Sequence, residues 1–170
     1  MKVRYGSLIA TVRLIGMDTP ETKDPRKPVQ CFGPQASAQA RHLLTGRSVW
    51  LAGDPTQSTF DKYGRELAYL WMPDGTLYNW WMIRGGYAHE YTYNAPYEYR
   101  AAFAAAQAAA RAEHRGFWSP STCNGNTTKT GAAVLPRAVP RAQPAGITLP
   151  AAALVSAGLP AIGGRDPPAG

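Results

Sequence analysis

"KVRYGSLIATVRLIG", residues 2–16, reads as two short β-strands joined by a Gly-Ser turn. Polar and apolar residues alternate along it, which is typical of a half-buried sheet, and a Gly-Ser pair between two such runs indicates a hairpin. In the second strand Val12 and Leu14 share one face, whereas Arg13 lies on the other. A half-buried arginine needs an anionic partner. The stretch therefore predicts a small sheet that presents a cation.

Two carboxylates follow this strand directly in "MDTPET", where Asp18 and Glu21 flank Thr19 and Pro20. Carboxylates in this arrangement can bind a hard cation, or one of them can act as a general base. Pro20 fixes its own φ and keeps Thr19 extended, so that the Thr19 carbonyl has a defined direction. The same residues also suit an ordinary turn or helix start. Glu21 could likewise be a structural ion-pair partner of Arg13.

A second arginine, Arg65, begins a predicted strand after the turn in "FDKYGREL". Residues at such junctions are well placed to point into a shared cleft. Two arginines and a divalent cation would stabilise the charge of a phosphodiester transition state, and a glutamate could activate water. Further on, "HEYTYNAP" places Tyr91 and Tyr93 at alternating positions, where they could stack on bases or pack against the following helix.

The remaining elements continue the strand pattern and end in helices. The sequence predicts a helix, two strands and two helices over residues 33–46, 48–53, 65–72, 76–86 and 96–116, in that order. Strands come first, one helix is inserted between them, and helices close the domain. This order predicts an α+β fold with a small antiparallel sheet. A barrel of the oligonucleotide-binding (OB) type would suit the early strands.

Composition divides the chain into two parts. All 5 Trp, 9 Tyr and 4 Phe of the 170 residues lie at or before Trp118. Residues 121–170 are rich in Ala and Pro and offer little large apolar surface, which predicts a disordered tail after a domain of residues 1–120. The net charge of +7 favours a polyanionic partner such as nucleic acid, although a mildly basic surface alone also accounts for it. No run is long and apolar enough to predict a membrane span or a secretory signal.

The two cysteines, Cys31 and Cys123, have neither zinc-site nor redox-motif spacing. They bracket most of the predicted domain, so a disulfide between them would close a long loop. Two free thiols are the alternative. A disulfide would indicate an oxidising compartment, and therefore an exported protein.

Taken together, several motifs in order resemble the staphylococcal nuclease (thermonuclease-like) family. They are "VRLIGMDTPET", "CFGPQASAQARHLL", "FDKYGRELAYLWMPDGTLYN", "IRGGYAHEYTY" and "AAFAAAQAAARAEHRGFWS". The resemblance covers nearly all of residues 1–120 and implies a five-stranded OB barrel with three helices. It implies a monomeric, calcium-dependent nuclease that hydrolyses DNA and RNA and leaves 3′-phosphate ends.

The resemblance also implies roles for individual residues. Arg13 and Arg65 match two phosphate-binding arginines, and Glu21 matches a general base for the attacking water. Asp18 matches a calcium ligand, and Thr19 would bind calcium through its backbone carbonyl. The residues expected to contact the nucleotide are Lys62, Tyr63, Tyr91 and Tyr93. The pair of Cys31 and Cys123 resembles one seen in some bacterial members, which favours the disulfide.

The resemblance fails at the start of the chain. Family members carry an earlier strand and an Asp-Gly-Asp-Thr turn, which supplies another calcium-ligating aspartate, before the strand seen here as "KVRYG". This chain begins at Met1, so we expect an N-terminally truncated barrel with its first strand missing, an open sheet edge and weaker calcium binding. The alternative function is a nucleic-acid-binding OB module with weakened or absent catalysis.

Overall fold

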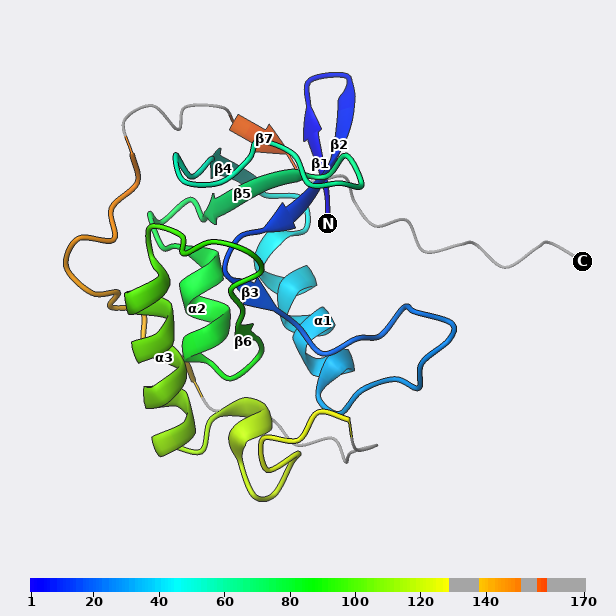
Figure 1. Cartoon of the computed structure of the whole chain (residues 1–170), viewed down its shortest axis with the longest axis vertical. Coiled ribbons are helices and arrows are strands. Elements are labelled where there is room, and N and C mark those ends of the chain that lie inside the picture. The colour runs from blue at the N-terminus through cyan, green and yellow to red at the C-terminus, as the bar shows by residue number, and fades with distance from the viewer. Residues whose placement is uncertain (129–137, 151–155, 159–170) are drawn as a thin grey trace, which may run out of the picture.

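The computed structural model describes residues 1–128, 138–150 and 156–158. Figure 1 shows a barrel at one end of the molecule and three helices beside it. The barrel contains β1 (Lys2–Tyr5), β2 (Leu8–Leu14), β5 (Glu66–Trp71), β4 (Ser48–Ala52) and β7 (Ser156–Gly158), in that order around the closed sheet. The predicted α+β fold with an OB-like barrel is therefore confirmed.

The barrel is mixed, whereas the sequence predicts an antiparallel sheet. Strands β2 and β5 run parallel, with Val12 opposite Glu66 and Leu14 opposite Ala68. All other pairs in the barrel are antiparallel. The parallel pair arises because α1 and β4 lie between the two strands in sequence and provide the crossover that parallel neighbours need.

Strand β7 closes the barrel at the edge that the sequence leaves open. Its backbone lies between β1 and β4, with Gly158 opposite Arg4 on one side and Ser48 on the other. An unpaired strand edge is a ready template for any extended backbone, so this edge is satisfied by pairing. The expectation of an open edge is wrong for this structure.

The described part of the tail also contacts the domain. Gln143 accepts a hydrogen bond from the Leu77 N–H (2.9 Å) and donates to the Gly75 carbonyl (3.2 Å). Ile147 is only 4% exposed, and the Ala138 carbonyl accepts a bond from the Arg115 guanidinium. Composition predicts disorder here because large apolar residues are scarce. One bidentate amide and one buried isoleucine nevertheless hold residues 138–150, which we call the strap.

The helices are α1 (Gly33–Leu44), α2 (Tyr78–Arg84) and α3 (Arg100–Ala112), followed by the 3₁₀ turn η1 (Gly116–Trp118). Helix α3 buries Phe103, Ala106 and Ala110, which share one face of the helix. Helix α2 is buried at every position from Tyr78 to Ile83, so it forms the centre of the core. The predicted three helices are thus confirmed.

Two connections hold the end of β2 in place. The Asn79 side chain donates to the Ile15 carbonyl (2.8 Å) and accepts from the Leu70 N–H (3.0 Å), which joins β2, β5 and α2. Beyond it, β3 (Met17–Asp18) pairs with β6 (His89–Glu90) in a small second sheet. These contacts place Asp18 at a rigid exit from the barrel.

Cys31 and Cys123 form a disulfide, with their Cα atoms 5.9 Å apart. It joins the start of α1 to the segment after η1. No helix in the described ranges has the length and apolarity that crossing a bilayer requires.

Candidate active site

Arg13 lies where β2 leaves the barrel. We call this edge of the barrel, with the loops that follow β3 and precede β5, the rim. Its Nη2 is 3.2 Å from Oδ1 of Asp18, and its guanidinium lies over the Tyr91 ring, 5.9 Å from the ring centroid. The two charged side chains are 32% and 50% exposed, so the pair faces solvent. The sequence suggests Glu21 as a structural partner for Arg13. The structure gives that place to Asp18, because the β3–β6 pair turns Asp18 back toward β2.

Arg65 is oriented by a residue that sequence reasoning did not single out. Asp61 accepts hydrogen bonds from the Arg65 backbone N–H (3.0 Å) and from its Nε (2.7 Å). The sequence contains the pattern that predicts this role. An aspartate four residues before an arginine, across a tight turn, can bind both the backbone and the side chain of that arginine. The Tyr63 ring lies beside Arg65 and Lys62, with centroid distances of 5.3 and 5.1 Å. The turn is therefore a preorganised cationic element.

The parallel register sets the end of β2, which carries Arg13, beside the start of β5, which Arg65 precedes. Arg13 is opposite Leu67, and Arg65 stands two residues before Leu67. The amino group of Met1 lies close enough to both arginines to feel their charges. Burial lowers its pKa, and the positive charges of Arg65, Lys23 and Arg13 lower it further. Cations from three segments thus act on one region, which is what an anionic ligand needs.

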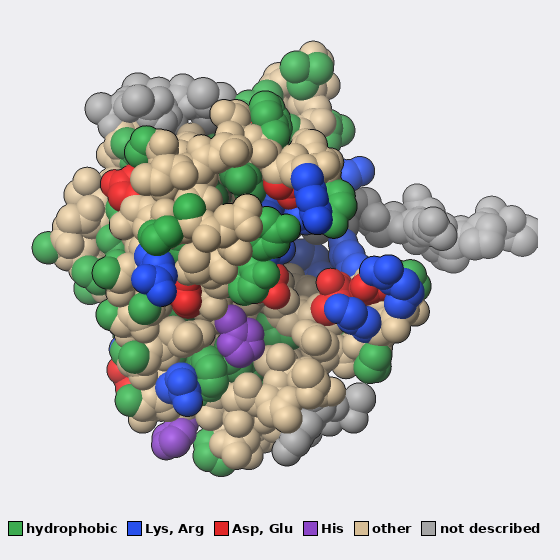
Figure 2. Space-filling model, in the orientation of Figure 1, with side chains coloured by type: hydrophobic (Ala, Val, Ile, Leu, Met, Phe, Trp, Pro, Cys, Tyr) green, Lys and Arg blue, Asp and Glu red, His purple; other side chains and the backbone are tan. Residues whose placement is uncertain are grey.

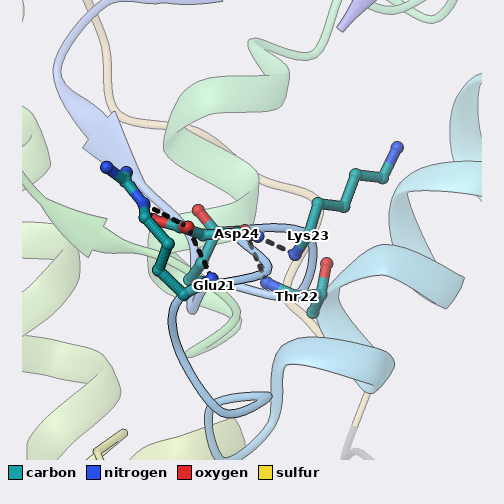
Figure 3. A network of polar contacts seen from close by, with 5 residues as sticks. Glu21, Thr22, Lys23 and Asp24 are labelled. Carbon is teal, nitrogen blue, oxygen red and sulfur yellow. Dashed lines mark hydrogen bonds and ion pairs between the residues drawn. The ribbon is translucent and has the colours of Figure 1, made fainter.

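Glu21 is fixed by the backbone of its own loop. Figure 3 shows its carboxylate facing the N–H groups that follow it. Its Oε1 accepts from Thr22 (2.7 Å), Lys23 (2.6 Å) and Asp24 (3.2 Å). These bonds, that of Lys23 foremost, lower the pKa of Glu21 despite the opposing effect of burial. The carboxylate is therefore ionised at neutral pH, as a general base must be.

The segment that follows β2 offers a calcium ion a small number of oxygen donors. The Asp18 carboxylate and the Thr19 carbonyl are the hard donors that calcium prefers, and both residues are exposed. Within the described ranges no group of three or more His, Cys, Asp or Glu side chains is arranged to hold a metal. The donors fit calcium in kind, and water and substrate oxygens would have to complete the six to eight ligands that it takes.

The two tyrosines of the aromatic loop lie at the surface next to Arg13. Tyr91 is 42% and Tyr93 65% exposed, and their ring centroids are 6.3 Å apart. The alternative that they pack into the core against α3 is therefore excluded by their exposure. With Tyr63, which is 71% exposed, they provide aromatic faces close to the cations.

On the face drawn in Figure 2, basic and acidic side chains gather where the loop between β3 and α1 projects in Figure 1. The two signs are interspersed there, and among them Arg26 pairs with Asp24. The site is thus a mixed cationic rim with its own carboxylates, which suits recognition of a phosphate by charge and of a base by stacking.

Comparison with known proteins places the chain in a family. The family model described as staphylococcal nuclease homologue matches residues 11–120. A thermonuclease of Staphylococcus hyicus is 36% identical over 108 residues, which are 64% of this chain and 62% of that protein. A thermonuclease of Staphylococcus intermedius is 39% identical over 107 residues, 63% of this chain and 62% of that protein. Endonuclease YncB of Bacillus subtilis is 34% identical over 122 residues, 71% of this chain and 57% of that protein. The chain thus spans less than two thirds of each of these relatives.

Proposed function

Since the chain belongs to the family of staphylococcal nuclease homologues, we propose that it is a calcium-dependent nuclease that hydrolyses phosphodiester bonds in DNA and RNA and leaves 3′-phosphate ends. The observation that carries this proposal is the meeting of the end of β2, which carries Arg13, with the start of β5, which Arg65 precedes. The ionised Glu21, in the loop that follows β3, supports it. Its relatives, two thermonucleases and an endonuclease, support the same reaction class.

The two arginines would bind and stabilise the reacting phosphate. Both guanidinium groups are partly exposed, and each is already oriented by an aspartate, Asp18 for Arg13 and Asp61 for Arg65. A phosphodiester gains negative charge on its equatorial oxygens in the transition state, and preorganised donors there lower the barrier. Arg13 and Arg65 would therefore act mainly on the transition state.

Glu21 would act as the general base. Its pKa lies below the usual value, so the carboxylate is ionised at neutral pH and its oxygens carry no proton of their own. Its orientation comes from backbone donors and does not depend on the substrate. Asp18 and Thr19 would hold calcium, which when bound supplies positive charge beside the phosphate. Lys62, Tyr63, Tyr91 and Tyr93 would contact the nucleotide.

The remaining properties follow from the disulfide and the surface. A bond between Cys31 and Cys123 persists in oxidising compartments, so we propose an exported protein. We further propose that it acts as a monomer, because both arginines and Glu21 come from a single copy of the fold.

The substitution Glu21→Gln tests the proposal. We expect turnover to fall by about 10²- to 10⁴-fold because the base is lost, while substrate binding is retained. The measurement is cleavage of a labelled oligonucleotide with calcium, compared with the same reaction in chelator. Glu98→Gln, at a glutamate outside the rim, is the matched control. Cleavage by Glu21→Gln at the wild-type rate would remove Glu21 from this role, and cleavage unaffected by the chelator would remove calcium.

One observation favours a second candidate, a nucleic-acid-binding module that does not cleave. The described residues offer Asp18 as the carboxylate for calcium without the group of three acidic or histidine ligands that would hold the ion firmly. This function predicts salt-sensitive binding of single strands and no cleavage with any divalent metal. Calcium-dependent cleavage by the chain would exclude it.

A further inference from the structure

The loop that carries Tyr91 and Tyr93 is anchored at one carbonyl beside the site. The Tyr91 N–H donates to the Gly16 carbonyl at 3.1 Å, and the Tyr97 hydroxyl donates to the same oxygen at 3.3 Å. Both ends of the loop therefore meet where β2 has just ended and β3 begins. Gly16 stands two residues before Asp18, so this contact links the aromatic loop directly to the phosphate-binding rim.

Tyr97 fits against Gly16 in a way that no other residue at position 16 would allow. A Cβ atom added to Gly16 would lie 2.5 Å from the Tyr97 ring, and the φ of Gly16 is +73°, which already favours glycine. Tyr97 itself is only 5% exposed, whereas the two tyrosines that it follows are open to solvent. The buried ring thus acts as the fixed base of an exposed aromatic loop.

A chain of hydrogen bonds extends from Tyr97 through the loop. The Tyr97 hydroxyl also lies 3.0 Å from Oε1 of Glu90, and the Thr92 hydroxyl donates to that same oxygen at 2.8 Å. Arg100 in turn donates to the Thr92 hydroxyl at 3.1 Å. Burial, with the nearby charge of Glu90, raises the pKa of Tyr97, so the hydroxyl keeps its hydrogen at neutral pH. Glu90 thus links Thr92, which stands between the two exposed tyrosines, to the buried Tyr97.

We propose that Tyr97 and Glu90 are positioning residues that set the place of Tyr91 and Tyr93 relative to Arg13, and so align a bound base with its phosphate. Tyr91 is the contact through which they act, because its ring lies against the Arg13 guanidinium. If the loop shifts outward, the stacking surface moves while Arg13 stays with Asp18. The inference rests on the proposed function, since it presumes that a nucleotide binds at this rim.

The first test uses Tyr97→Phe, which keeps the ring on Gly16 and removes the one hydroxyl hydrogen that the Gly16 carbonyl and Glu90 share. The probe is a short oligothymidylate that contains one 2-aminopurine, whose fluorescence falls when it stacks on an aromatic ring. With calcium we expect KM to rise about fivefold to tenfold, the effect of losing one hydrogen bond, and kcat to change far less. In chelator, where no cleavage complicates the reading, we expect the stacking signal to weaken.

Glu90 supplies the second test through a conservative variant. Glu90→Gln keeps a side-chain oxygen that can accept from Tyr97 and Thr92, so KM and the stacking signal should stay near the wild-type values. Glu90→Ala removes the acceptor and should resemble Tyr97→Phe. Tyr78→Phe, at a buried tyrosine of α2, is the control for loss of a hydroxyl outside the loop and should leave both readouts unchanged.

The outcomes separate this inference from the proposed function. If the wild-type chain stacks the probe and Tyr97→Phe stacks it equally well with an unchanged KM, the positioning role is wrong while the nuclease proposal stands. A fall in kcat with unchanged KM would also overturn it. If the wild-type chain gives neither stacking nor cleavage, the proposed function fails and this inference fails with it.

Discussion

The polar contacts of the rim and those of the interior differ in how far they reach along the chain. At the rim, Arg65 is held by Asp61, four residues away, and Glu21 accepts from the three residues that follow it. In the interior, the amide of Asn79 joins a carbonyl 64 residues away. Chemistry is thus positioned by local turns, whereas the fold is held by buried bonds between distant segments.

This difference separates the energetics of the two regions. Exposed ion pairs contribute little to stability, because water competes for both charges and two long side chains must be ordered. A buried polar group that loses its partner destabilises the fold by the full free energy of removing that group from water. Substitutions at the rim should therefore change activity with little effect on folding, and substitutions in the interior should do the reverse.

The strongest way to break the comparison is at the disulfide, a covalent link between two distant segments. Cys31 and Cys123 are 92 residues apart, and opening a loop of that size in the unfolded chain should lower the free energy of unfolding by about 4 kcal/mol. Urea unfolding of the Cys31→Ser, Cys123→Ser double variant measures this without leaving a free thiol. A loss below about 1 kcal/mol would mean that the long-range link is not what holds the fold.

Asp54→Asn should have the next largest effect. Asp54 is 6% exposed and accepts bonds from the Tyr69 hydroxyl, the Glu98 N–H and Thr56. Burial alone would raise its pKa, but these bonds together lower it below the ordinary value of an aspartate. An amide would turn N–H groups toward donors, so we expect about 1–3 kcal/mol of destabilisation at neutral pH.

The same pKa shift predicts an acid dependence. Because the folded-state pKa of Asp54 is depressed, its contribution is present above the unfolded value near 3.8 and is lost as the pH falls below it toward the folded value. Melting temperatures measured from pH 6 downward should therefore converge for wild type and Asp54→Asn. Parallel curves would show that Asp54 does not stabilise the fold through its charge.

Asp24→Asn should have the smallest effect on stability. It sharpens the comparison because it makes the same chemical change as Asp54→Asn at a residue of the rim. Asp24 also accepts a bond from a backbone N–H two residues ahead, at 3.0 Å from Arg26, against 2.8 Å from Thr56 for Asp54. Its other partner is the exposed Arg26 side chain. We expect no measurable change in melting temperature at pH 7. A shift comparable to that of Asp54→Asn would erase the distinction between rim and interior.

The reach of the contacts also explains what the sequence could predict. The hairpin, the three helices and the turn before Arg65 depend on residues within a few positions of each other, so local sequence patterns predict them. For the ion pair of Arg13 the sequence suggests Glu21, whereas the structure has Asp18 as the partner. Which carboxylate turns back toward Arg13 depends on the β3–β6 pair, whose second strand lies some seventy residues further on.

Other features depended on packing that no local pattern encodes. The strap has the composition of a disordered segment, and it is the burial of Ile147 and the hydrogen bonds of Gln143 and Ala138 that distinguish it. Tyr97 looks like any tyrosine in an aromatic run until Gly16 is placed beneath its ring. The parallel pairing of β2 with β5 was missed because alternation along a strand is nearly the same in either orientation.

That parallel pair has a consequence for how the molecule assembles. Strands β4 and β5 and helix α2 are neighbours in sequence and can associate early, but β2 must wait for the intervening chain to be arranged before it can join β5. Loop closure of this kind slows folding, because its entropy is lost before the contacts are gained. Since both arginines flank this seam, the phosphate-binding rim would be among the last parts of the barrel to form during refolding.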